Sequence, residues 1–401
     1  MPSDQSTWLV SIPHDGDAEG AYQELHSKLK SVSKSPVLSQ LAVPSFKTGT
    51  LESLVSLSED LPKQDAFFTA TVAKIVDTLR NLLNNDSSKL SQHVLVNEQP
   101  VDDYLLNDWR WNEGRYGTQR GLREMADVLI KEMTSIDNVM KNKLNSYNLA
   151  KGALVQLQRK KTGNLSVRSL ADVVKPEHFI QDSEYLETVL VAVPKTLAKD
   201  WNAKYERLTN FVVPRSSVLI ASDDDYALFG VVIFRRVHDE FVQKCRENNT
   251  TTEPSGTRFI VRDFIYSEDV LQKQREELET ADATEKELWT ELLRLSRTNF
   301  SEAFQILVHL KVLQLFVESV LRYGLPANYT GFIIKPEPKA TKRTLNILQQ
   351  QLGYLASRSN PTAAKTSSKS TNTEDFVGEY QTLLDQEYFD FVLFEVPWII
   401  L

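Results

Sequence analysis

The chain has 401 residues, of which 41% are hydrophobic and 25% charged, so it can form two or three globular domains with buried cores. Its formal net charge of −8 disfavours a protein that coats nucleic acid with its whole surface, although a local basic patch stays open. The single cysteine, Cys245, excludes an internal disulfide and the cysteine-rich zinc motifs, and is typical of a reducing compartment.

The first 118 residues contain one clear strand and one clear helix. The apolar run at 8–13 ends in proline and predicts a strand, after which we expect a polar, loop-rich stretch to about Ser45. Apolar residues at helical spacing predict a helix from Asp65 to Asn84, ended by Asn84-Asn85-Asp86. Four aromatic residues then predict a packed corner: Tyr104, Trp109, Trp111 and Tyr116.

A long helix is predicted from residue 119 to 159. Its apolar residues recur at steps of 4, 4, 3, 4, 4 and 3: Met125, Leu129, Met133, Ile136, Met140, Leu144 and Tyr147. This spacing places them on one stripe, and its period of 11 residues is typical of a nearly straight helix or a slight right-handed supercoil. About 40 residues with a rise of 1.5 Å extend roughly 60 Å, which is longer than one compact domain can bury.

The stretch Arg159-Lys160-Lys161-Thr162-Gly163 allows two interpretations. A phosphate-binding loop needs glycines before its lysine, so that backbone N–H groups point at the phosphate, but here the glycine follows the lysines. Cations in a last helical turn, followed by glycine, instead favour the end of a helix. We therefore predict that a domain boundary lies here.

The segment from 160 to 266 predicts a small α/β domain. Strands and helices follow in the order β-α-β-β-α-β, which is typical of a split βαβ sheet. The expected strands are 186–193, 217–221, 226–234 and 258–266, and the expected helices are 195–207 and 237–246. Asp223-Asp224-Asp225 fits a hairpin turn better than a cation site, and 248–257 is a polar loop.

A second long helix is predicted from 267 to 323, ended by Gly324-Leu325-Pro326. A strand at 331–335, a helix at 341–356 and a strand at 389–396 follow. The Ser/Thr-rich segment 357–375 is expected to be a mobile loop.

These elements predict a helix-rich α+β fold in the form of an elongated dumbbell. A lone strand is not stable, so the strands near the two ends of the chain are expected to pair. The parts would be a discontinuous foot built from both termini (1–118 and 324–401), a neck of two helices (119–159 and 267–323) and an inserted α/β head (160–266).

We find no catalytic or metal-binding constellation, and we predict no cofactor. The six histidines are scattered, and none of the motifs G-x-S-x-G, H-E-x-x-H and G-x-G-x-x-G occurs. The acids from His14 to Gly20 resemble half of an EF-hand loop, but His26 occupies the position that needs glutamate. We also expect no signal peptide and no membrane span, because a basic N-terminal segment and a run of about 18 apolar residues are missing.

Surface-binding residues are the remaining candidates. Basic clusters at Arg159 to Lys161, Arg235-Arg236 and Lys339 to Arg343 could dock acidic partners or could be solvated ends of helices and strands. Aromatic residues where predicted elements join could be interface or core. The candidate partner-binding residues are Lys160, Lys161, Arg235, Arg236, Phe264, Tyr266, Phe391 and Phe394.

Five segments resemble the C subunit of the vacuolar-type proton-pumping ATPase (V-ATPase). They are KKTGNLSVRSL at 160–170, VVKPE at 173–177, TVLVAVPK at 188–195, FIYSE at 264–268 and VESVLRYGLP at 317–326. The resemblance extends over nearly the whole chain, and the loops at 248–257 and 357–375 are longer than the family pattern needs.

The resemblance implies a head-and-foot fold and a non-catalytic protein of the pump's stator. Such a protein links the ATP-hydrolysing sector to the membrane sector and leaves when the pump disassembles. Its head would bind one peripheral stalk, a heterodimer of the E and G subunits, and its foot a second stalk and the cytoplasmic domain of the membrane-embedded a-subunit. We expect it on the cytoplasmic face of vacuolar and other acidified endomembranes, or free in the cytosol after disassembly.

Some family members bind actin filaments, so the resemblance also allows an actin contact. A cytoskeletal or coiled-coil adaptor that never meets the pump stays the alternative, and an enzyme is a third hypothesis. A rise in melting temperature with a nucleotide would favour the enzyme. Nucleic acid is not an expected partner.

Overall fold

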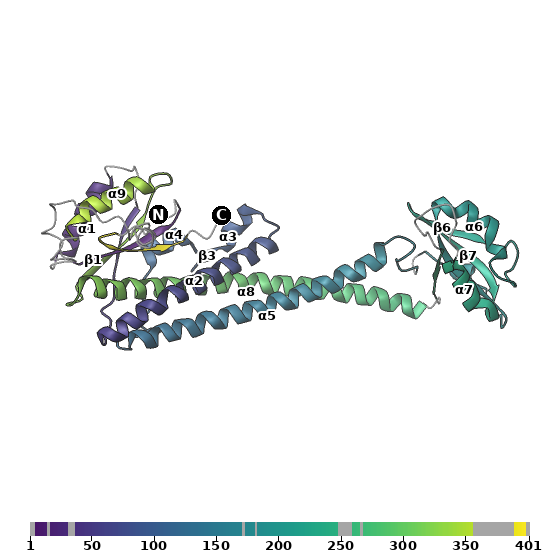
Figure 1. Cartoon of the computed structure of the whole chain (residues 1–401), viewed down its shortest axis with the longest axis horizontal. Coiled ribbons are helices and arrows are strands. Elements are labelled where there is room, and N and C mark those ends of the chain that lie inside the picture. The colour runs from purple at the N-terminus through teal and green to yellow at the C-terminus, as the bar shows by residue number, and fades with distance from the viewer. Residues whose placement is uncertain are drawn as a thin grey trace, which may run out of the picture. The chain divides into compact units, whose positions relative to one another are not determined.

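The computed structural model describes residues 5–13, 17–30, 37–170, 173–180, 183–247, 259–264, 268–355 and 389–397. The chain divides into two units, which Figure 1 shows in ribbon form. Unit 1 comprises Met1–Leu144 and Thr290–Leu401, and unit 2 comprises Asn145–Trp289. Unit 2 is therefore inserted into the sequence of unit 1.

Unit 1 contains a four-stranded antiparallel sheet that joins both ends of the chain. Strand β1 (Thr7–Pro13) lies between β10 (Val392–Val396) and β9 (Tyr329–Lys335), and β2 (Val37–Leu41) pairs with the other side of β9. The strands expected at the two ends of the chain are thus neighbours in one sheet.

Side chains of β1 alternate between two buried faces. Trp8, Val10 and Ile12 pack against α1 (Ala18–Lys30) and α9 (Thr341–Leu352). On the opposite face, the hydroxyl of Ser319 on α8 (Glu268–Tyr323) donates to Ser11 Oγ at 2.8 Å. Because both faces are covered, Trp8, Leu9 and Val10 are consecutive apolar residues rather than alternating with polar ones.

Long helices form the rest of unit 1, where α2 (Leu51–Leu82) packs with parts of α5 (Leu122–Thr162) and α8. Ion pairs tie them together: Lys311–Asp65 joins α8 to α2, Lys74–Asp137 joins α2 to α5, and Lys143–Glu291 joins α5 to α8. Short elements connect α2 to α5, namely α3 (Ser87–His93), β3 (Leu95–Val96), β4 (Gln99–Pro100), α4 (Val101–Asp103) and a π-helical turn (Tyr104–Asp108).

One stretch of α8, Gln272–Tyr323, is long and apolar enough to cross a membrane by composition alone. Its most apolar window is 83% buried inside the protein, as is usual for a core helix.

Unit 2 contains a second four-stranded antiparallel sheet, in the order β6-β7-β5-β8. Its elements follow the chain as β5 (Leu186–Pro194), α6 (Ala198–Lys204), β6 (Val218–Ser222), β7 (Tyr226–Phe234), α7 (His238–Glu247) and β8 (Ile260–Arg262). Single 3-10 turns flank α6 at Lys195–Leu197 and Tyr205–Arg207, and one precedes α7 at Arg235–Val237. The predicted β-α-β-β-α-β order is confirmed, with the first and third strands at the centre of the sheet.

Different segments of the chain pack on the two faces of this sheet. Trp201 of α6 and Phe241 and Cys245 of α7 are buried against one face. Leu165 and Leu170, from the segment after α5, are buried against the other. Part of the segment 160–170, one of the five that resemble the family, therefore belongs to the unit 2 core.

The predictions were wrong in the N-terminal region. The expected loop before Ser45 contains α1 and β2, and α2 begins at Leu51 rather than Asp65. Only Leu25 and Leu29 of α1 are buried, so its apolar pattern is weak. Pro62 lies inside α2, which continues through it because Leu54, Leu57 and Leu61 still pack on the core.

Other observed element boundaries also differ from the predicted ones. The last strand of unit 2 is only Ile260–Arg262, and the helix expected at 195–207 is α6 with its flanking 3-10 turns. The final strand begins at Val392 rather than 389. The loops expected at 248–257 and 357–375 lie outside the described residues.

Candidate docking surfaces

The basic stretch at 159–163 is the end of a helix, as predicted. Lys160 and Lys161 lie exposed in the last turn of α5, and the N–H of Gly163 donates to the carbonyl of Arg159 at 2.9 Å. The phosphate-loop interpretation is therefore not supported by the backbone.

The chain directly after this helix end is fastened to the unit 2 sheet. The Arg262 guanidinium donates to three successive carbonyls, those of Ser166, Val167 and Arg168. On the other side, the Asp223 carboxylate accepts the N–H of Leu165 at 2.5 Å. These contacts hold the segment after α5 in one position.

Asp223 belongs to the acidic turn for which a cation had been considered. Besides Leu165, it accepts the N–H groups of Asp225 and Tyr226. Burial alone would raise the pKa of Asp223, but these three backbone donors together lower it. The Asp223 carboxylate thus accepts hydrogen bonds that stabilise the fold.

Arg235 and Arg236 follow β7 and are both exposed. The Arg236 guanidinium lies 3.6 Å from the ring centre of Phe211 and 5.7 Å from that of Phe234. Among the described residues, no carboxylate forms an ion pair with either arginine. The sequence analysis missed Phe211, which no local pattern marks because 25 positions separate it from Arg236.

The aromatic candidates do not form one site. Phe264 is half-buried and stacks on Phe179 at a centroid distance of 6.2 Å, while Tyr266 lies outside the described residues. Phe391 is 1% exposed, which favours its core interpretation, and Phe394 is half-buried on the edge strand β10. Phe391 and Phe394 belong to unit 1, whereas the cations and Phe264 belong to unit 2.

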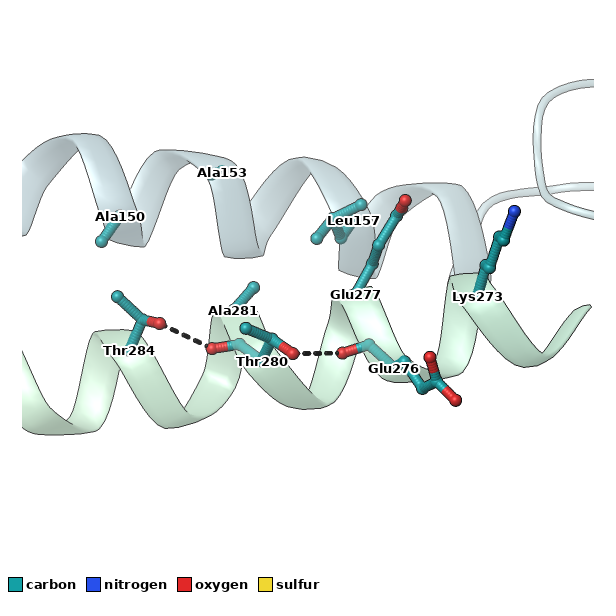
Figure 2. A pocket seen from close by; sticks show the side chains of 9 residues that line it. All are labelled: Ala150, Ala153, Leu157, Lys273, Glu276, Glu277, Thr280, Ala281 and Thr284. Carbon is teal, nitrogen blue, oxygen red and sulfur yellow. Dashed lines mark hydrogen bonds between the residues drawn. The ribbon is translucent and has the colours of Figure 1, made fainter. Parts of the chain in front are cut away.

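A groove of about 610 Å³ separates α5 and α8 within unit 2 (Figure 2). Mostly small residues line it: Ala150, Ala153, Leu157, Lys273, Glu276, Glu277, Thr280, Ala281 and Thr284. The hydroxyls of Thr280 and Thr284 donate to carbonyls of their own helix at 2.6 and 2.7 Å. Small side chains therefore leave the two helices incompletely packed here.

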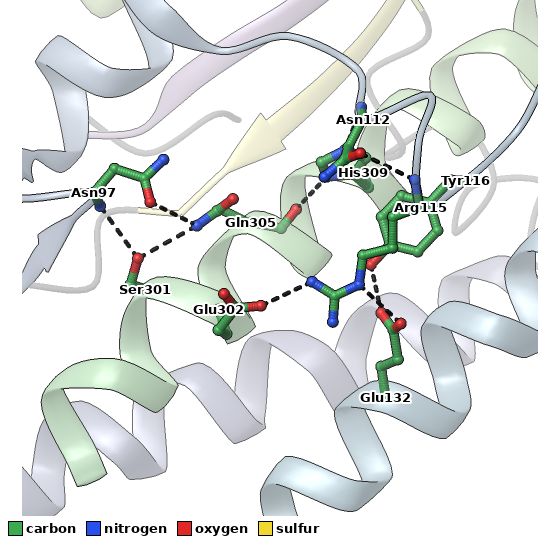
Figure 3. Close-up of polar contacts among 9 residues, drawn as sticks. All are labelled: Asn97, Asn112, Arg115, Tyr116, Glu132, Ser301, Glu302, Gln305 and His309. Atoms are coloured by element: carbon green, nitrogen blue, oxygen red, sulfur yellow. Dashed lines mark hydrogen bonds and ion pairs between the residues drawn. The ribbon is translucent and has the colours of Figure 1, made fainter.

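Unit 1 contains a polar network around Arg115, shown in Figure 3. The Arg115 guanidinium donates to Glu132 of α5 at 2.9 Å and to Glu302 of α8 at 2.8 Å, and the Tyr116 hydroxyl also donates to Glu132. Burial would lower the pKa of Arg115, but its bonds to Glu302 and Glu132 raise it. The network joins the two long helices through the loop before α5.

His309 lies beside this network and is only 3% exposed. Its Nδ1 lies 2.7 Å from the carbonyl of Gln305, to which it donates, and its Nε2 accepts the N–H of Asn112 at 3.1 Å. The rings of Trp109, Trp111 and Tyr116 surround it, which confirms the expected packing for three of the four aromatic residues. Burial lowers the pKa of His309 to about 4, so the ring is neutral and structural.

Exposed arginine beside exposed aromatic rings is the typical composition of protein–protein interfaces. Within the part of the chain that the structure describes, no group of three or more His, Cys, Asp or Glu could hold a metal ion. The surface around Arg236 and Phe211 has the composition of a protein-binding face.

Comparison with known proteins identifies the family. The family model for the C subunit of V-ATPase matches residues 7–392. The V-type proton ATPase C subunit of Manduca sexta is 39% identical over 352 residues, covering 87% of this chain and 89% of the relative. The C 1 subunit of the Macaca fascicularis enzyme is 37% identical with the same coverage, and the C 1-A subunit of Danio rerio is 36% identical over 97% of each chain. The chain therefore belongs to the family of V-ATPase C subunits.

Proposed function

We propose that the chain is the non-catalytic C subunit in the stator of a proton-pumping V-ATPase, which links the ATP-hydrolysing sector to the membrane sector and controls their reversible assembly. The observation that carries this proposal is the family match over nearly the whole chain. The match gives no support to an adaptor that is independent of the pump.

The proposed architecture is a dumbbell. Its head is 160–266, its neck is 119–159 with 267–323, and its foot is 1–118 with 324–401. The insertion of unit 2 into unit 1 supports this division, as does the presence of residues from both units in α5 and α8. Helices without an internal break suit a stator, because it must transmit torque without bending.

The proposed partners are other proteins of the pump on the cytoplasmic side of acidified membranes. The head would bind one E–G heterodimer through the surface that includes Lys160, Lys161, Arg235 and Arg236. The foot would bind a second heterodimer and the cytoplasmic domain of the membrane-embedded a-subunit. Several moderate polar interfaces acting together hold firmly and still release when one of them fails, as reversible assembly requires.

A complementation experiment tests this function. In cells that lack their own member of the family, expression of this chain should restore attachment of the ATP-hydrolysing sector to the membrane and acidification of the organelle. A relative from the same family serves as the positive control. A chain that is expressed and folded but restores neither property would contradict the proposal.

Titration calorimetry of the full chain with purified E–G heterodimer is the direct test. Saturable binding is expected, and its affinity should fall with ionic strength because exposed cations contribute. Absence of heat and of co-migration on size exclusion would rule out the stalk as a direct partner.

A further inference from the structure

We propose that Arg236, Phe211 and Phe234 form a docking point on unit 2 for an acidic segment of a partner protein. A partner carboxylate would bind the Arg236 guanidinium, and a neighbouring apolar side chain would pack on Phe211. The identity of the partner, an E–G heterodimer, rests on the function proposed above, whereas the chemistry rests on the geometry of the three side chains.

Three chain segments converge at this docking point. The N–H of Phe234, the last residue of β7, donates to the carbonyl of Phe211 at 3.2 Å, and Val212 forms a bridge with Ile233. On the other side of β7, the N–H of Arg235 donates to the carbonyl of Tyr185 at 2.9 Å. The docking point is thus supported by backbone pairing in the sheet rather than by a free loop.

Phe211 has a strained backbone and an exposed ring. Its φ is +74°, in the left-handed region that is unfavourable for a residue with a side chain. The side chain is nevertheless 50% exposed, so the strain does not serve to bury it. Strained residues with no stabilising burial are concentrated at functional positions, and here the strain holds an aromatic ring against Arg236.

The Arg236 guanidinium is held in one orientation and can still bind a partner. Stacking on a ring at 3.6 Å restricts the guanidinium to one plane and leaves its edge N–H groups open to a partner. Glu187 lies opposite Ile233 in the sheet, but it is bonded to His238 at 2.7 Å rather than to an arginine. A planar, immobilised guanidinium fits the two oxygens of one carboxylate, and less entropy is lost on binding.

The surroundings favour a protein over a polyanionic lipid or nucleic acid. Tyr185 is 71% exposed and Phe211 half exposed, so apolar surface accompanies the two arginines. The chain as a whole has a net charge of −8, which repels extended polyanions. Arginine and large aromatic residues dominate binding energy at protein interfaces.

The experiment measures binding of full-length variants to purified E–G heterodimer by calorimetry. We expect Arg236→Ala to weaken binding about tenfold or more, and Arg236→Lys to lose most of that affinity as well, because lysine cannot stack and bind bidentately. Phe211→Asn should also weaken binding about tenfold while tolerating the positive φ. Arg246→Ala, which removes an exposed arginine of α7 in the same unit, is the matched control and should leave the affinity unchanged.

The outcomes separate this proposal from the proposed function. If the wild-type chain binds and the Arg236 and Phe211 variants, shown to be folded by circular dichroism, bind equally well, the docking point is overturned and the stator function stands. If the wild-type chain does not bind the heterodimer, the docking point and the stalk as a direct partner are both overturned, and the complementation experiment decides separately whether the stator function stands. Loss of binding to phosphatidylserine vesicles, with heterodimer binding intact, would assign the arginines to a lipid surface and overturn the proposal.

Discussion

The two ends of α8 are one continuous helix in opposite surroundings. From Ala303 to Val317 every residue except Gln305 is buried, whereas from Gln272 to Thr280 every residue except Leu278 is exposed. Packing stabilises the first stretch. The second depends more on contacts along the helix, such as Gln272 to Glu276 at 3.0 Å and the Thr280 hydroxyl to the Glu276 carbonyl at 2.6 Å.

The units differ in how they treat charge. In unit 1, the buried Lys311 is paired with Asp65, and the more exposed Arg115 is paired with Glu132 and Glu302. Unit 2 leaves Arg235 and Arg236 facing outward without an acidic partner among the described residues. Loss of the Lys311–Asp65 pair should therefore lower the stability of unit 1, whereas loss of the Arg236 charge should weaken binding by unit 2.

The buried pair in unit 1 gives the largest expected effect. Lys311 is 5% exposed, and its Nζ donates to Asp65 at 2.7 Å. Asp65→Ala leaves this ammonium buried without its carboxylate, so we expect the free energy of unfolding in urea to fall by about 3–5 kcal/mol. Asp65→Leu combined with Lys311→Met should recover most of the loss. Asp60→Ala, which breaks the exposed pair with Arg123, is the control and should cost less than about 1 kcal/mol.

Paired leucine truncations on α8 test the packing contrast directly. Leu310 is fully buried in unit 1, and its replacement by alanine should cost about 2–5 kcal/mol. Leu278 is half-buried in unit 2, so Leu278→Ala should cost less than about 1 kcal/mol. Equal losses in the two variants would show that the two parts of the helix are packed to the same extent.

His309 predicts a pH dependence of unit 1. Its pKa is about 4 in the folded chain against 6.5 ordinarily, so the unfolded chain binds more protons between these values. The free energy of unfolding should fall as pH drops from 6.5 towards 4, by up to about 1.4 kcal/mol per pH unit. In urea titrations at several pH values, the free energy of unfolding should change less steeply with pH for His309→Gln than for the wild-type chain.

The most local expected effect concerns the segment after α5. Arg262→Ala removes the donor to the carbonyls of Ser166, Val167 and Arg168, at an expected cost of about 2 kcal/mol. Hydrogen exchange of the amides from 163 to 170 should accelerate while that of unit 1 is unchanged. Arg246→Ala should alter neither the free energy of unfolding nor the hydrogen exchange of residues 163–170. If it alters them, the effect of Arg262→Ala comes from loss of charge rather than from loss of the carbonyl contacts.

Periodicity predicted the long elements well, because 41 residues of α5 and 56 of α8 repeat their signal many times. It failed for α1, where two buried leucines provide too little pattern, and for the first turns of α2, where Pro62 interrupts the helical signal. Helix ends were predictable from local chemistry: α8 ends at Tyr323, before Gly324 with a φ of +80°.

The candidate site was predictable only in part. The dipeptide Arg235-Arg236 is visible in the sequence, but the role of Phe211 is not, since neither its positive φ nor its contact with a residue 25 positions away leaves a local pattern. The sequence could not show whether Phe391 is a core residue or an interface residue, because apolar residues on a terminal strand occur in both places. The hydrogen bonds from Arg262 to three carbonyls could not be predicted either. Their acceptors are backbone atoms, which every residue type has.

The placement of β1 has a consequence for how the protein is made. This strand lies between β9 and β10, yet about 315 residues separate it from β9 in the chain. At roughly 5–20 residues per second, a ribosome needs about 15–60 s to supply the missing neighbour. Throughout that interval the nascent chain exposes an apolar segment, Trp8-Leu9-Val10, with no strand to pair with, while all of unit 2 emerges and can fold first. Newly synthesised chains should therefore depend on chaperones that shield the N-terminus until β9 and β10 have left the exit tunnel.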